Sequence, residues 1–238
     1  MNRFAEELDK LRTRIIKMGS LVDEQIEYAF RALNEWNVPM ARIVMEREEK
    51  VDRLDMKIEK QCQRLFALQQ PVARDLRLIM AALKINSDLE RMGDLAFNVA
   101  RIVEPLLPYR DSVARLELTQ MTGAVHTMVR HTIDSFVNND PELALSIMKS
   151  DIRVDQYETR IGRAVVDMMK REPEFIEPGT MLIVALRNME RLADHATNIA
   201  EDVIFFTQAR LVRSHSDELS AELGEDLLGD DETEASEE

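Results

Sequence analysis

The stretch Leu89-Glu90-Arg91-Met92-Gly93-Asp94-Leu95-Ala96-Phe97-Asn98-Val99-Ala100 returns one hundred residues later as Met189-Glu190-Arg191-Leu192-Ala193-Asp194-His195-Ala196-Thr197-Asn198-Ile199-Ala200. Glu, Arg, Asp, Asn and Ala recur in the same order and at the same spacing. The segments around the two copies have otherwise diverged. The repeated pattern therefore indicates an internal duplication that has kept particular polar positions.

The repeated polar positions are four residues apart: Glu90, Asp94 and Asn98 in the first copy, and Glu190, Asp194 and Asn198 in the second. An α-helix has about 3.6 residues per turn, so a step of four returns to nearly the same face. Each stretch therefore predicts a short ladder of oxygen ligands along one helix face. Two carboxylates one turn apart repel each other unless a cation lies between them.

Apolar side chains recur at helical spacing in six long segments. We expect helices over about 4–36, 39–68, 73–103, 111–138, 141–170 and 180–210. Proline marks the breaks between them, at Asn37-Val38-Pro39, Gln69-Gln70-Pro71, 104–108, 138–141 and 171–179. At about 30 residues each, these helices are long for a globular protein.

The two halves of the chain match over their second helices as well as their third. The segment from Met45 to Ile58 matches the segment from Met148 to Ile161, and acidic residues recur at the same positions in both. The sequence therefore predicts an all-α protein made of two tandem three-helix bundles, related by a pseudo-twofold internal repeat. We expect the first bundle over 1–107, the second over 108–212, and an acidic tail over 213–238.

The second helices carry ladders of their own, so each half contains two acid-x-x-x-acid pairs. Consecutive helices joined by a short turn lie antiparallel and adjacent, which brings the two pairs of each half together. Such a cluster at neutral pH takes up protons or binds cations. The predicted metal ligands are Glu48, Asp52, Glu90 and Asp94 in the first half, and Asp151, Asp155, Glu190 and Asp194 in the second.

Oxygen-rich clusters suit Mg, Ca, Mn or oxidised Fe, and Zn also accepts carboxylates, so the spacing leaves the metal open. The alternative is that these acids form a solvated helix face. Glu90 and Asp94 lie opposite the main apolar stripe of their helix, so we expect the ladder face to be open to water. His195 directly follows Asp194 and is either a ligand, a neighbour of a ligand, or a packed or solvated histidine.

Composition excludes several classes of protein. The single cysteine, Cys62, excludes an intramolecular disulfide and a Cys-rich zinc or iron–sulfur site. The N-terminus lacks the apolar run of a signal peptide, and the apolar run from Met181 to Leu186 is too short to cross a bilayer. We therefore expect a cytoplasmic protein without direct membrane insertion.

The formal net charge of −14 is unevenly distributed. Residues 216–238 hold eleven acids and no base, so the rest of the chain carries only about −3. This composition predicts a disordered tail. A chain of this charge gives no support to a nucleic-acid partner.

The two signatures, Leu89-Glu90-Arg91-Met92-Gly93-Asp94-(x)3-Asn98 and Met189-Glu190-Arg191-Leu192-Ala193-Asp194-(x)3-Asn198, resemble the paired signatures of the PhoU family. These are accessory proteins of bacterial phosphate-specific transport. The resemblance covers residues 1 to about 212, including the acidic pairs on the second helix of each half. The acidic tail lies outside it.

The resemblance implies a cytoplasmic, non-catalytic negative regulator of phosphate uptake and of the phosphate-starvation response. It implies an adaptor between the ATP-binding subunit of the phosphate importer and a sensor histidine kinase. Some members bind multinuclear iron or zinc clusters through acid-x-x-x-acid pairs, which correspond here to the eight carboxylates named above. We also expect a homodimer.

Two other functions remain as alternatives. A carboxylate-bridged metalloenzyme is disfavoured because the chain contains no Glu-x-x-His, the signature of di-iron helical bundles. It also has no Gly-rich phosphate loop and no Gly-x-Ser-x-Gly nucleophile motif. A purely structural helical spacer is the second alternative, and it predicts that substitutions in the ladders have no effect in cells.

Overall fold

The computed structural model describes residues 3–213, which form helices, turns and short connections with no strand. The six long helices are α1 (Arg3–Glu35), α2 (Val38–Gln69), α3 (Ala73–Ala100), α6 (Leu118–Asn138), α7 (Pro141–Arg171) and α8 (Ile176–Gln208). Their order and lengths confirm the all-α prediction. The predicted tail lies outside the described residues, apart from its first residue, Arg213.

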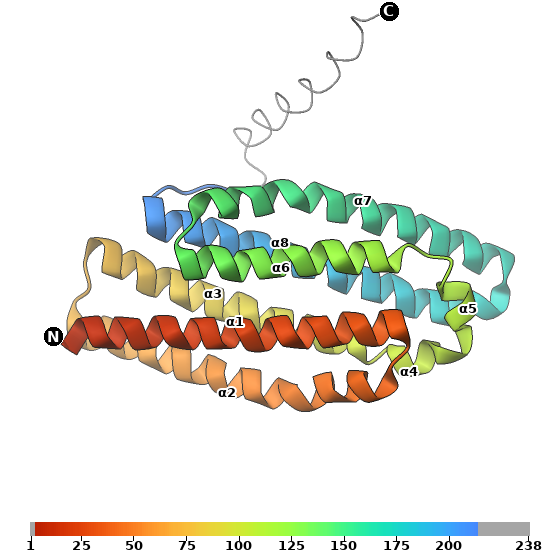
Figure 1. The fold of residues 1–238 in the computed structure, drawn as a ribbon, viewed down its shortest axis with the longest axis horizontal. Coiled ribbons are helices and arrows are strands. Elements are labelled where there is room, and N and C mark those ends of the chain that lie inside the picture. The colour runs from red at the N-terminus through yellow and green to blue at the C-terminus, as the bar shows by residue number, and fades with distance from the viewer. Residues whose placement is uncertain (1–2, 214–238) are drawn as a thin grey trace, which may run out of the picture.

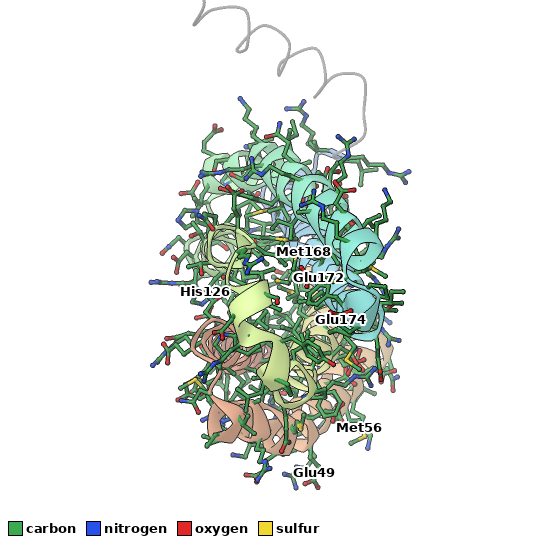
Figure 2. All side chains as sticks on the ribbon, turned by 90° about the vertical axis from the view of Figure 1, so that its right-hand side faces the viewer. Glu49, Met56, His126, Met168, Glu172 and Glu174 are labelled. Carbon is green, nitrogen blue, oxygen red and sulfur yellow. The ribbon has the colours of Figure 1, made fainter. Side chains whose placement is uncertain are left out.

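The long helices run roughly parallel to one axis and form two bundles that lie side by side (Figure 1). The first bundle contains α1, α2 and α3, which all contact one another, and the second contains α6, α7 and α8. Seen along the helices, the first bundle lies below the second (Figure 2). The repeat predicted from the sequence is thus two three-helix bundles, as expected.

The bundles meet through corresponding helices, since α3 packs on α8 and α1 packs on α6. This pairing of equivalent elements is what a pseudo-twofold relation requires. One continuous apolar core runs through both bundles and across their contact. The domain boundaries predicted after residues 107 and 212 stay predictions.

The chain crosses between the bundles through short helical pieces, where the sequence predicts a simple break. These are α4 (Val103–Leu106), the 3-10 turn η1 (Leu107–Tyr109) and α5 (Arg110–Val113). The prediction of a helix over 111–138 is therefore wrong at its start, because α6 begins at Leu118. Val113 is buried and Leu116 packs on the core, so the apolar spacing continues through a segment that is not one helix.

The last long helix also begins earlier than predicted. Residues 171–179 were expected to form a turn, whereas only the 3-10 turn η2 (Pro173–Phe175) separates α7 from α8. Pro178 lies in the first turn of α8. Backbone N–H groups in the first turn have no acceptor within the helix, so a proline there costs no hydrogen bond. The next residue, Gly179, packs closely against α7, because a Cβ at this position would lie 2.5 Å from Cγ of Met169.

Polar contacts tie the two bundles together along their interface. Arg12 on α1 donates to the carbonyl oxygens of Phe136 and Val137 at 3.2 and 2.9 Å, near the end of α6. His126 on α6 lies 3.1 Å from Asp23 on α1. These contacts fix the angle between the bundles in addition to the apolar packing.

No helix within residues 3–213 combines the length and the apolar composition that spanning a bilayer requires.

Candidate functional site

The carboxylates of the first half lie on the facing sides of α2 and α3. On α2, Glu48, Asp52 and Asp55 follow one another at steps of four and three, which keeps them on one helix face. On α3, Glu90 and Asp94 are one turn apart. The short turn between the two helices makes them antiparallel, so the two acidic faces meet.

The pKa shifts in the first half identify which carboxylates are close. Burial raises the pKa of Glu48, and the carboxylates of Asp94 and Asp52 raise it further. Burial also raises the pKa of Glu90, followed by Asp94, while Arg91 opposes the rise and Asp55 and Asp52 add to it. The four residues predicted from the sequence therefore form one electrostatically coupled group in this half.

One arginine partly balances this group. The Arg91 guanidinium lies 3.5 Å from Oε2 of Glu90 and 3.4 Å from Oδ2 of Asp94. Its side chain is 59% exposed, so water screens both contacts. The pKa of Glu90 remains raised despite them, mainly because the side chain is partly buried and also because Asp94, Asp55 and Asp52 lie near it.

The second half repeats the arrangement with different surroundings. Burial raises the pKa of Glu190, and Asp194, Asp155 and Glu158 raise it further, while Arg187 lowers it. Asp155 on α7 thus faces Glu190 and Asp194 on α8. Asp151 lies one turn before Asp155 and is half-buried. It lies on the same face of α7 as Asp155, but it is not among the carboxylates that raise the pKa of Glu190.

Two further acids belong to these clusters and were missed by the sequence prediction. Asp55 and Glu158 occupy equivalent places, three residues after Asp52 and Asp155. Asp55 also accepts a hydrogen bond from Nδ2 of Asn86 at 2.5 Å, which fixes its carboxylate beside α3. The match between the two halves contains both residues, so the repeat was the signal that could have found them.

The ladder face, expected to be open to water, is only partly open. Glu90 and Asp94 have side chains that are 26% and 35% exposed. By contrast Glu49, next to Glu48, is 77% exposed and pairs with Arg53 at 3.2 Å. Figure 2 shows Glu49 pointing away from the first bundle. The clusters are therefore partly shielded from solvent, while the neighbouring Glu49 is largely exposed.

His195 makes a different contact from the one its place beside Asp194 suggests. Its Nδ1 lies 2.8 Å from Oδ1 of Asp88 on α3, across the contact between the bundles. Of the two ladder amides, Asn98 is half-buried and Asn198 is exposed. His195 therefore serves the interface between α3 and α8 in this conformation.

The donor set of each cluster fits a hard cation. Within residues 3–213, no three His, Cys, Asp or Glu side chains are already arranged to hold a metal ion. The carboxylates nevertheless gather from two facing helices, where burial raises the pKa values of Glu48, Glu90 and Glu190 and repulsion from neighbouring carboxylates raises them further. A cation between the helices would relieve that repulsion, and carboxylate oxygens are the ligands that Mg, Mn and oxidised Fe prefer.

Comparison with known proteins gives consistent matches over both halves. The family model described as the PhoU domain matches residues 15–103 and 118–203. The phosphate-specific transport system accessory protein PhoU homolog of Pseudomonas putida is 37% identical over 213 residues, which is 89% of this chain and 83% of the relative. The homolog of the same name from Caulobacter vibrioides is 33% identical, over 85% of this chain and 88% of the relative.

Solved structures agree with the sequence matches. The crystal structure of PhoU from Pseudomonas aeruginosa superposes with a TM-score of 0.83 at 35% identity, covering 87% of this chain and all of that one. The phosphate transport system regulatory protein PhoU from Streptococcus pneumoniae gives a TM-score of 0.78 at 28% identity, covering 89% of this chain and all of that one.

Proposed function

The chain belongs to the PhoU family, and from that premise we propose that it is an accessory protein of a phosphate-specific transport system. The observation that carries this proposal is the match of the PhoU domain to both halves, each with its own acidic ladder. Relatives that align over most of their own length bear the accessory name. Its role is regulatory and non-catalytic.

The finer role is that of a negative regulator. In this proposal the protein acts in the cytoplasm, as a homodimer, between the ATP-binding subunit of the phosphate importer and a sensor histidine kinase. It limits phosphate uptake and represses the phosphate-starvation response when phosphate is plentiful. The family resemblance supports this, and the absence of known catalytic motifs from the sequence is consistent with it.

A deletion strain tests the regulatory role. In phosphate-rich medium, loss of the protein should raise expression of a phosphatase reporter that responds to phosphate starvation, and the intact gene should restore repression. A deletion strain that still represses the reporter normally under these conditions would count against the role. Co-purification with the importer subunit or the kinase then tests the adaptor role separately.

The second part of the proposal is that each half binds metal through its carboxylate cluster. The ligands are Glu48, Asp52, Glu90 and Asp94 in one half and Asp151, Asp155, Glu190 and Asp194 in the other, with Asp55 and Glu158 beside them. The support is the gathering of partly buried carboxylates on facing helices, where burial first and neighbouring carboxylates second raise the pKa values of the three glutamates. Iron or zinc clusters, or Mg or Mn ions, fit this donor set.

Elemental analysis of protein purified without chelator tests metal binding. Replacing Asp94→Asn and Asp194→Asn together should lower the metal content by more than half. In chelator the same variant should melt no lower than the wild type, because each change removes one repelling charge. Glu49→Gln is the matched control, since Glu49 lies next to Glu48 but faces solvent. A wild-type protein without bound metal contradicts this part alone.

The same samples separate the alternatives. A carboxylate-bridged metalloenzyme predicts oxygen-dependent turnover by the metal-loaded protein. A helical spacer predicts that the Asp94 and Asp194 changes are silent in the reporter strain. The regulatory proposal predicts neither result.

A further inference from the structure

A groove of about 650 Å³ lies on the surface of the second bundle, between α6 and α7. Its rim includes exposed side chains from both helices, among them Thr127 and Ser150. Its floor is apolar, because Met128 and Ile147 are almost completely buried there. The groove is separate from the carboxylate clusters, which lie where α2 meets α3 and where α7 meets α8.

The groove is cationic in a protein that is acidic overall. His131, Lys149 and Arg153 line it, and its described lining contains no Asp or Glu. Arg153 donates to the Tyr157 hydroxyl at 3.3 Å, and its guanidinium lies 5.7 Å from the centre of the Tyr157 ring. A guanidinium has five N–H donors, so Arg153 keeps several for an anionic ligand. The groove therefore suits an anion that also carries apolar groups.

We propose that the acidic C-terminal segment of this same chain, residues 216–238, docks in this groove. The segment has eleven acids and no base, which complements the three basic side chains. It also has leucines four residues apart, at Leu219, Leu223 and Leu227, which suit the apolar floor. A lone inorganic anion would leave that floor uncovered.

The end of the described chain is close enough for this docking. α7 and α8 are adjacent and antiparallel, so the C-terminus of α8 lies at the end of the molecule where α7 begins (Figure 1). The groove residues of α7 start at Ile147, about 9 Å along the helix from Pro141 at 1.5 Å per residue. The 25 residues after Arg213 extend up to about 80 Å, which exceeds the length of α7. The segment is therefore long enough to reach the groove of its own chain.

This inference goes beyond the proposed regulatory function and does not depend on it. It assigns the acidic segment a place on its own protein. The contact is electrostatic and lies at the surface, so salt should weaken it.

Paramagnetic broadening in the full-length chain tests the docking. A nitroxide on Thr127→Cys marks the rim. The native Cys62 stays unlabelled because it is fully buried and burial raises its pKa to about 12. We expect amide signals within residues 216–238 to lose at least half their intensity, and to recover in about 0.5 M salt.

Charge reversal in the groove provides the specific control. Lys149→Glu with Arg153→Glu should restore the tail signals, while Arg163→Glu, on α7 but outside the groove lining, should leave the broadening unchanged. Melting curves confirm that each variant is folded. Broadening that survives the double reversal, or no broadening in the wild type, overturns the proposal.

Mixed samples identify the occupant. When isotope-labelled chains without nitroxide are mixed with unlabelled chains that carry it, docking within one molecule predicts no broadening. Broadening in the mixture, reduced in proportion to the fraction of chains that carry nitroxide, shows that the tail of a second copy fills the groove, which contradicts docking in the same chain. Loss of the effect in 10 mM inorganic phosphate but not in chloride of matched ionic strength would show that phosphate displaces the tail from the basic side chains of the groove, which supports docking there.

Discussion

Asp202 is a buried carboxylate on α8, at the contact between the two bundles. Its side chain is 7% exposed, and its Oδ1 accepts a hydrogen bond from Nζ of Lys84 on α3 at 2.9 Å. Burial raises its pKa from 3.8 to about 6; Lys84 opposes this rise, and the charges of Asp88 and Glu201 add to it. The Asp202→Asn substitution should therefore change how stability depends on pH.

The sign and size follow from the direction of the shift. Between pH 3.8 and about 6 the folded protein holds a proton on Asp202 that the unfolded chain has lost, so the free energy of unfolding falls as pH rises. About two pH units at 1.36 kcal/mol each give roughly 3 kcal/mol. Asn cannot ionise, so it does not incur this loss. The stability of Asp202→Asn relative to wild type should thus increase by up to about 3 kcal/mol between pH 4 and pH 7.

Urea unfolding at a series of pH values measures the difference in free energy of unfolding between the variant and the wild type. Groups that titrate alike in both proteins cancel in this difference. Asp134→Asn, which removes an exposed carboxylate from α6, corrects for the loss of one negative charge. A difference between variant and wild type that stays constant from pH 4 to pH 7 would refute the reasoning. A difference that falls with pH would show that Lys84 overcomes the cost of burial.

Three other substitutions test the fold. Gly93→Ala should raise the free energy of unfolding in urea by about 0.5–1 kcal/mol, because Ala favours the helix and its Cβ would meet Val51 at 3.5 Å, an ordinary contact. Arg12→Ala should cost about 1–2 kcal/mol in the same assay, since it removes hydrogen bonds to the end of α6, including one to Asn139 at 3.0 Å. Ala209→Gly should raise the free energy of unfolding by about 1 kcal/mol and therefore also the melting temperature. Ala209 ends α8 at a φ of 57°, which glycine adopts without strain.

The sequence predicted the elements of this fold well and their ends less well. Hydrophobic spacing located six long helices, and Pro at the breaks located most of their ends. Spacing could not show that the chain turns at 114–117, because Val113 and Leu116 are apolar and contact the core whether or not they share a helix. It also treated Pro178 as a breaker, although the first turn of a helix tolerates proline.

Helical periodicity was enough to predict that Glu90 and Asp94 share one face of α3, and metal binding by that face stays a prediction. Their partial shielding from solvent was not predicted, since it depends on how α3 packs against α2 and α8. Asp55 and Glu158 were missed because a step of three was not counted with the steps of four. The partners of His195 and Asp202 lie more than one hundred positions away in the sequence, and no local pattern specifies such pairs.

The central claim is that the two carboxylate clusters serve regulation of the phosphate response. Complementation of the deletion strain in phosphate-rich medium tests it most directly, by comparing the wild type with Asp94→Asn plus Asp194→Asn, at matched protein levels. The account predicts that the wild type and the Glu49→Gln control repress the phosphatase reporter, while the double variant, although folded, leaves it at least severalfold higher. Full repression by the double variant would contradict the claim.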